Sequence, residues 1–152
     1  MRLTTKGRYG VRAVLNLAAA YANRPISIKT IAADEGISPE FLEQIFFKLK
    51  KSGIISSVRG PGGGFILNRK PSEVSVKDIL DAVGEPTFPA PCTDPGDPDR
   101  CSRRETCNVT HTWHRFNSVI NEFLSGLTLK DILEEGGGKL AHGVKQGQDF
   151  AI

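Results

Sequence analysis

Two short helical segments joined by a glycine, with a glycine-rich hairpin directly after them, constrain the fold of this 152-residue chain more than any other feature. Residues 28–35 carry apolar side chains at helical spacing, and Gly36 stands where a helix commonly ends in a left-handed residue. The next segment opens with Ser38 as N-cap and Pro39 at the favoured first position, and it ends at Gly53. Two short helices joined in this way are typical of a helix-turn-helix.

The segment after these helices predicts two short strands, 54–58 and 65–67, joined by a loop with four glycines among its six residues. A phosphate-binding loop is disfavoured, because no Lys-Ser or Lys-Thr pair follows the glycines and no helix begins there. An unstructured loop is the other alternative. A β-hairpin wing fits better, and further helices are expected at 8–22 and 75–83. The sequence therefore predicts a mainly α fold with a small β-hairpin wing, a winged helix-turn-helix over residues 1–84.

Charge is divided unevenly along the chain. The net charge is +3, but residues 1–70 hold twelve Lys and Arg against four Asp and Glu. Residues 71–152 hold eight Lys and Arg against thirteen Asp and Glu. Charged faces that are merely solvated are the plain alternative, but a basic half joined to an acidic half suits a domain that docks on phosphates. The charge thus suggests a nucleic-acid partner without proving one.

Polar residues of the third helix and of the wing are the candidates for contact with double-stranded DNA. A helix fits the major groove, where Gln44 can pair with adenine and Glu40 can accept from cytosine. Arg59 in the wing suits a narrow minor groove. Each residue taken singly is more readily explained as an ordinary surface side chain, so the prediction depends on the whole set. The predicted contacts are Ser38, Glu40, Gln44, Ser57, Arg59, Gly60, Arg2, Thr4 and Lys51.

All three cysteines lie in the second half of the chain. Five prolines and few apolar residues predict a loop over 85–99, which holds Cys92, and Cys101 and Cys107 follow. Thiolates bind soft metals, so zinc, an iron–sulfur cluster and inert thiols are the alternatives. The spacing lacks the C-x2-C pair that is usual for structural zinc. Spacing alone leaves these alternatives open.

A long helix follows the cysteines and ends at Gly126, with an apolar stripe formed by Trp113, Phe116, Val119, Ile120 and Phe123. Such a stripe must be buried, either against its own copy in a dimer or, as the alternative, against its own domain. We expect a dimer. The predicted organisation is a cysteine-bearing cluster loop over 85–106, a dimerisation helix with a short following helix over 107–135, and a flexible tail over 136–152.

Several classes of protein are disfavoured. No stretch approaches the roughly 18 consecutive apolar residues of a membrane span, and the first residues lack the features of a signal peptide. We therefore expect a cytoplasmic protein with no membrane partner, in a compartment where thiols stay reduced. No pair of histidines at ligand spacing with an associated carboxylate is present, so we expect neither an enzyme nor a small-molecule substrate.

Residues 1 to about 133 resemble the Rrf-two (Rrf2) family of bacterial transcription regulators, in its iron–sulfur cluster regulator branch. The resemblance rests on LTTKGRY at 3–9, ISPEFLEQI at 37–45, SGII at 52–55, SVRGPGGGF at 57–65 and the three cysteines before Trp113. It implies a homodimer on palindromic promoter DNA and a cluster, usually 2Fe–2S, bound by Cys92, Cys101 and Cys107. It also implies that the cluster sets operator choice and so controls cluster-assembly genes. The alternative is a regulator of the same fold that senses nitric oxide or redox state through a different cluster or zinc.

The chain departs from that branch at two places. The gap between the first two cysteines, C-x8-C, is longer than usual. The histidine that often follows the third cysteine by three residues is replaced by Thr110, and His111 comes one residue later, on the helix face of Cys107. Glu43 is the slightly favoured fourth ligand, because a ligand on the DNA-reading helix would couple cluster and DNA directly. The alternative for both residues is an ordinary surface side chain.

Overall fold

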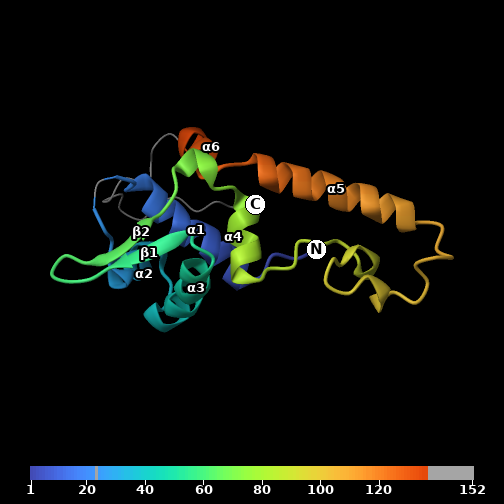
Figure 1. Cartoon of the computed structure of the whole chain (residues 1–152), viewed down its shortest axis with the longest axis horizontal. Helices are drawn as coiled ribbons and strands as arrows, with labels where there is room; N and C mark the ends of the chain where they lie inside the picture. Colours follow the sequence, from blue (N-terminus) through green and yellow to red (C-terminus); the bar gives the residue numbers. More distant parts are fainter. Residues whose placement is uncertain (23, 137–152) are drawn as a thin grey trace.

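Helices and one hairpin make up residues 1–22 and 24–136, the part of the chain described by a computed structural model (Figure 1). The predicted mainly α fold with a β-hairpin wing is confirmed. Of the predicted tail, residues 137–152 lie outside the described residues. The elements are α1 (Thr5–Ala19), α2 (Ile28–Glu35), α3 (Pro39–Lys51), β1 (Ile55–Val58), β2 (Gly64–Leu67), η1 (Pro71–Glu73), α4 (Val76–Val83), η2 (Pro91–Thr93), η3 (Pro98–Arg100), α5 (Thr110–Gly126) and α6 (Leu129–Glu135).

Capping side chains determine where the helices of the winged domain begin. The hydroxyls of Ser27 and Ser38 accept hydrogen bonds from backbone N–H groups of the first turns of α2 and α3. The first helix differs from the expected 8–22 at both ends. Thr4 caps it early, and Ala22 adopts φ 66°, in the left-handed region, beyond the helix end at Ala19. The hydrogen bond to the Thr4 side chain therefore sets where this helix begins, and apolar spacing alone does not predict its ends.

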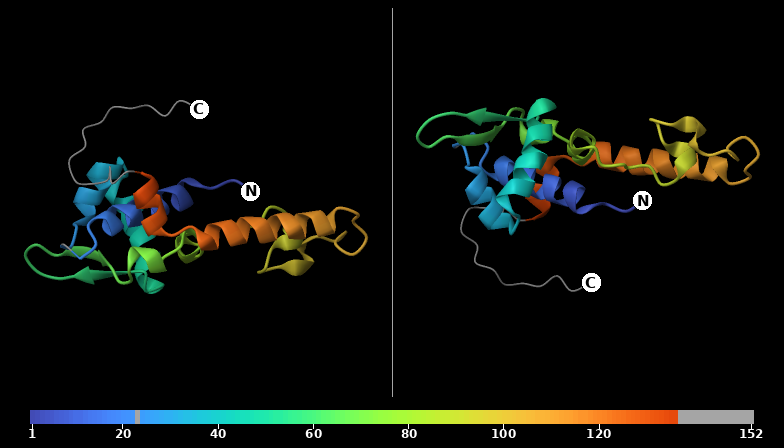
Figure 2. Two further views of the ribbon diagram at one scale, coloured as in Figure 1. Left: turned by 90° about the horizontal axis from the view of Figure 1, so that it is seen from above. Right: turned by 90° about the horizontal axis from the view of Figure 1, so that it is seen from below.

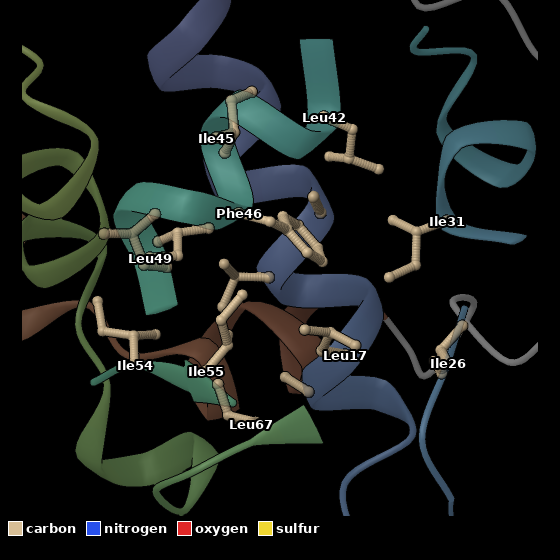
Figure 3. Packing of buried hydrophobic residues seen from close by; sticks show 14 of the residues in the cluster. Leu17, Ile26, Ile31, Leu42, Ile45, Phe46, Leu49, Ile54, Ile55 and Leu67 are labelled. Atoms are coloured by element: carbon tan, nitrogen blue, oxygen red, sulfur yellow. The ribbon is translucent and has the colours of Figure 1, made fainter. Parts of the chain in front are cut away.

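The core forms where α3 packs between α1, α2 and the hairpin (Figure 3). One face of α3 is completely covered, since none of its core residues exposes more than 1% of its surface: Leu42, Ile45, Phe46 and Leu49. The ring of Phe46 packs edge-on against that of Phe65, with centroids 4.8 Å apart. This contact joins α3 to the wing through the core.

The wing is an antiparallel hairpin whose register pairs Ile55 with Leu67 and Val58 with Gly64. A second attachment holds its base, because Phe65 exchanges two backbone hydrogen bonds, of 2.8 and 3.0 Å, with Ile26 before α2. A Cβ atom at Gly64 would lie 2.3 Å from the Ile26 carbonyl oxygen, so only glycine permits this approach. The base of the wing is thus fixed, and its glycine-rich tip extends away from the core (Figure 1).

Residues 85–127, called the arm below, leave the winged domain at one end of α4 and return at the other. At the return point, the Val76 N–H donates to the Leu127 carbonyl at 2.9 Å and the Leu129 N–H donates to the Val74 carbonyl at 3.0 Å. Leu129, the first residue of α6, is completely buried in the core. The short helix grouped by sequence with the dimerisation helix therefore packs on the winged domain.

The loop after α4 runs outward from the winged domain, and α5, which extends far beyond the other helices, runs back alongside it (Figure 2). Residues of η2 contact α5 on this side, and α4 contacts it nearer the core. No helix in the described ranges has the length and apolar character that crossing a membrane requires.

Candidate DNA-binding surface and cysteine arm

The face of α3 opposite the core is a row of exposed polar side chains. Four of them share one face of the helix, because Glu43 and Gln44 follow Glu40 by three and four residues and Lys51 follows Gln44 by seven. Ser38 lies at the start of this row, where its hydroxyl accepts from the Phe41 N–H at 3.3 Å. The polar residues expected to contact bases are therefore collected on one accessible helix surface.

The wing residues predicted for DNA contact lie on the hairpin that follows α3. Ser57, Arg59 and Gly60 are all exposed, and Gly60 turns the chain at the tip with φ 99°. The ammonium group of Lys50 donates to the Ser57 hydroxyl at 3.0 Å, which ties the end of α3 to the first strand. The recognition helix and the wing are thus fixed relative to each other, as simultaneous contact with two grooves requires.

The N-terminal residues meet a buried carboxylate that the sequence analysis did not single out. Glu85 is only 4% exposed, and its two carboxylate oxygens accept from the Thr4 N–H at 2.6 Å and the Thr4 hydroxyl at 2.5 Å. Arg2, two residues before Thr4 in the sequence, is exposed. Thr4 therefore fixes the start of α1 against the first residue of the arm. No local sequence signal indicates a pairing between residues 81 positions apart.

A substitution at Gly7 tests the contact between Glu85 and Thr4, because a Cβ atom there would lie 2.8–2.9 Å from the carboxylate of Glu85. We expect Gly7→Ala to displace Glu85, break both hydrogen bonds to Thr4 and lower the free energy of unfolding by about 1–3 kcal/mol. Chemical denaturation followed by circular dichroism measures the change. Gly126→Ala is the matched control, since no atom lies within 4 Å of its added Cβ. Equal stability of the two variants would contradict a structural role for the Glu85 contact.

Three consecutive residues at the end of α4 are bonded to residues of α1 and α3 or next to them. The Val83 carbonyl accepts from the Lys48 ammonium of α3 at 3.2 Å, and the Gly84 carbonyl accepts from the Lys6 ammonium of α1 at 3.3 Å. Glu85 follows with its two bonds to Thr4. Lysines at a helix C-terminus are favoured by the exposed carbonyls and the helix dipole. The root of the arm is therefore joined directly to both α1 and α3.

The three cysteines are free thiols along the arm. Cys92 is 5% exposed in η2, while Cys101 and Cys107 are half-buried. The Val109 backbone N–H lowers the pKa of the Cys107 thiol most, Thr110 at the start of α5 lowers it further, and the nearby charge of Arg103 adds to this shift. The thiolate is the form that binds metals, so these surroundings suit a thiolate ligand.

The structure does not gather the proposed ligands into one place. In residues 1–22 and 24–136, no three His, Cys, Asp or Glu side chains lie close enough to hold a metal ion. Glu43 is exposed on α3, and His111 is exposed in the first turn of α5. In Figures 1 and 2, α3 and the start of α5 lie at opposite ends of the molecule. The donor types therefore suit a soft metal centre, but their present arrangement does not form one.

The stripe predicted on the long helix is exposed along α5, which has no buried residue. The exposed fraction is 39% for Trp113, 48% for Phe116, 62% for Val119 and 64% for Phe123. Contiguous apolar patches of this kind mark interaction surfaces. Within its own chain, α5 is contacted by α4 and η2, and these contacts leave four of the five stripe residues exposed and Ile120 half-buried.

Comparison with known proteins identifies the relatives of this chain. Residues 3–135 match the Rrf2 family, described as iron-dependent transcriptional regulators. The chain is 40% identical over 134 residues to the HTH-type transcriptional regulator IscR of Vibrio cholerae serotype O1, covering 88% of this chain and 75% of that one. The solved structure of T. potens IscR has a TM-score of 0.74 at 33% identity and 94% coverage of both chains.

A relative with another name shares the fold equally well. The structure of CymR, the global cysteine regulator of B. subtilis, has a TM-score of 0.72 at 30% identity, covering 89% of this chain and 98% of that one. The family and these relatives are transcription regulators and not enzymes, and the resemblance found in the sequence motifs is confirmed. This winged-helix chain, with its exposed polar α3 face and its IscR relatives, belongs to the Rrf2 family of DNA-binding transcription regulators.

Proposed function

We propose that this protein selects its operators according to the state of an iron–sulfur cluster, most simply 2Fe–2S, bound by Cys92, Cys101 and Cys107. The observation that supports this most is the location of three free thiols on an arm whose root is bonded to α1 and α3. The genes it would control are those for cluster assembly, since relatives named IscR suggest a cluster regulator. A regulator of transcription acts beside the chromosome, so we infer a cytoplasmic location.

Three thiolates are the donors that iron–sulfide cores require, so the donor set fits a cluster. The two half-buried cysteines, Cys101 and Cys107, lie between η3 and α5, where the chain forms turns and no regular helix or strand. A change in the backbone conformation of residues 93–109 would bring their thiols toward Cys92. A cluster would supply a charged, redox-active centre. A conformational change of the arm on cluster binding would reach α1 and α3 through the hydrogen bonds of Val83, Gly84 and Glu85.

His111 is the fourth ligand we now favour within one chain, with Glu43 as the alternative. His111 lies in the first turn of α5, and Cys107 lies in the turn that leads into this helix, four residues earlier. The sequence slightly favoured Glu43, but α3 lies at the other end of the molecule from the start of α5 (Figure 1). Ligation by Glu43 would therefore require a second copy of the chain. His111→Ala should make the cluster labile, and Glu43→Ala should instead alter operator choice.

For DNA contact, we propose that α3 enters the major groove with Ser38, Glu40 and Gln44 at base edges. The wing places Arg59 in the adjacent minor groove, supported by Ser57 and Gly60. Arg2 and Lys51 neutralise phosphates, and Thr4 holds the N-terminal segment in position. Two copies joined through the stripe on α5 would bind a palindromic site, with one half-site for each copy.

Anaerobic purification with visible absorption spectroscopy and quantitation of iron and sulfide tests the cluster. We expect a coloured protein, and we expect Cys101→Ala to lose most of its visible absorbance while keeping its helical circular dichroism, because thiolate ligation holds the core. Ser102→Ala, at the next exposed position, is the matched control and should stay coloured. A colourless protein containing zinc, or a Cys101→Ala variant with an unchanged spectrum, would refute the cluster proposal.

A further inference from the structure

Phe47 is the residue on the outer face of α3 that neither the core nor phosphate binding explains. Its side chain is 70% exposed, the most of any large hydrophobic side chain in the described part of the protein. The preceding residue, Phe46, is 1% exposed and lies in the core, so the two rings lie on different faces of the helix, one in the core and one in solvent. Leaving an aromatic ring in water is unfavourable, and its burial against a partner would be favourable.

The position of Phe47 identifies the partner. It follows Gln44 by three residues and precedes Lys51 by four, which places it in the row of residues that faces the DNA. The lysines near it are held by other contacts, Lys48 by the Val83 carbonyl and Lys50 by the Ser57 hydroxyl. Helix α5 extends away from the winged domain (Figure 2), and Phe47 on α3 is not part of its exposed stripe.

Only one base edge in the major groove offers an apolar group to such a ring, namely thymine with its C5-methyl group. We propose that Phe47 is a specificity-determining residue that packs on the methyl group of an operator thymine. The proposal rests on the docking of α3 in the major groove proposed above. Phe47 lies about 4.5 Å along the helix axis from Gln44 at 1.5 Å per residue. The thymine is therefore expected one or two base steps, of about 3.4 Å each, from the base that Gln44 contacts.

The experiment begins with selection of operators from a random DNA library by the wild-type protein and by Phe47→Ala. The wild-type consensus should contain a thymine in each half-site that the Phe47→Ala consensus lacks. Each thymine of the wild-type operator is then replaced by deoxyuridine, which removes the methyl group alone. At the contacted position, this replacement should weaken wild-type binding about fourfold per half-site, the effect of one buried methyl group.

The same replacement should have no effect on Phe47→Ala, and a reduced effect on Phe47→Leu, which keeps an apolar side chain. Lys51→Ala is the matched control on the same face, and it should bind all operators more weakly while remaining sensitive to the replacement. Because Phe47 is exposed, its substitution should leave the fold intact, and circular dichroism checks this.

Two different failures can be told apart. If the wild-type protein selects an operator but is insensitive to every thymine methyl group, or if Phe47→Ala keeps the full sensitivity, the inference about Phe47 is wrong. If Phe47→Ala instead lowers the fraction of dimer in sedimentation and leaves the deoxyuridine scan unchanged, Phe47 belongs to a protein interface and the inference is also overturned. A wild-type protein that selects no sequence overturns the docking of α3 itself.

Discussion

Specific DNA binding by this protein should weaken by a factor on the order of 10³–10⁵ between about 50 and 200 mM salt, the loss expected for roughly six to ten phosphate contacts. The physical cause is the release of condensed counterions when lysines and arginines neutralise phosphates. Exposed basic side chains that make none of the contacts described for Lys6, Lys48 and Lys50 lie on or beside the elements that would face DNA: Arg2, Arg8, Lys51 and Arg59. A dimer would present this set twice, which is enough for the predicted number of contacts.

Fluorescence anisotropy titrations at several salt concentrations measure the slope of log affinity against log salt. Lys51→Ala should reduce this slope by about one for each half-site. Lys130→Ala is the matched control, because Lys130 is an exposed lysine on α6 that pairs with Glu134 and has no predicted DNA contact. A slope near zero for the wild-type protein would contradict docking of the basic surface on the phosphate backbone.

The second large effect is expected in assembly. Phe123→Asp should convert the dimer to monomers, because it places a charge in the surface that a second copy would bury, and an unpaired buried charge costs several kcal/mol. Phe123 is 64% exposed in the single chain, so its replacement should not disturb the fold of that chain. Analytical ultracentrifugation measures the oligomeric state. The monomer should lose cooperative binding to palindromic sites whose half-sites lie about 34 Å apart.

Ser118→Asp adds the same charge to an exposed position of α5 that lies off the stripe, and this control should remain dimeric. The half-buried Ile120 is a less suitable test, because it is partly covered within its own chain. An unchanged dimer in Phe123→Asp would locate the interface on a different surface of the molecule.

Sequence patterns correctly predicted the helices and strands whose ends are determined by residues adjacent to them in the sequence. Ser27 and Gly36 fix α2, Ser38 and Pro39 fix the start of α3, and the glycines after Arg59 fix the hairpin. The first helix was misplaced because its end depends on backbone geometry at Ala22 and not on apolar spacing. Burial of Leu129 in the core was missed because α6 reaches it through contacts with residues far away in the chain.

The candidate site was predictable to a similar extent. Spacing and chemistry singled out the exposed polar residues of α3 and the three cysteines, since these features are local. Glu85 was missed because its partner, Thr4, lies 81 residues away. Phe47 was missed because an apolar residue beside a helical stripe carries no sign of being exposed. Helical spacing did identify the neighbouring Phe46 as a residue of the apolar face, and it packs against Phe65.

The two attachment points of the arm have a consequence for how a protein of this kind can change over evolutionary time. Both junctions lie at the two ends of one eight-residue helix, α4, whose core face is fully packed. Insertions, deletions or exchanges within residues 85–127 therefore leave the span between the junctions unaltered. A single DNA-binding scaffold can in this way accept arms of different length and chemistry, and each new arm inherits the same connection to α1 and α3.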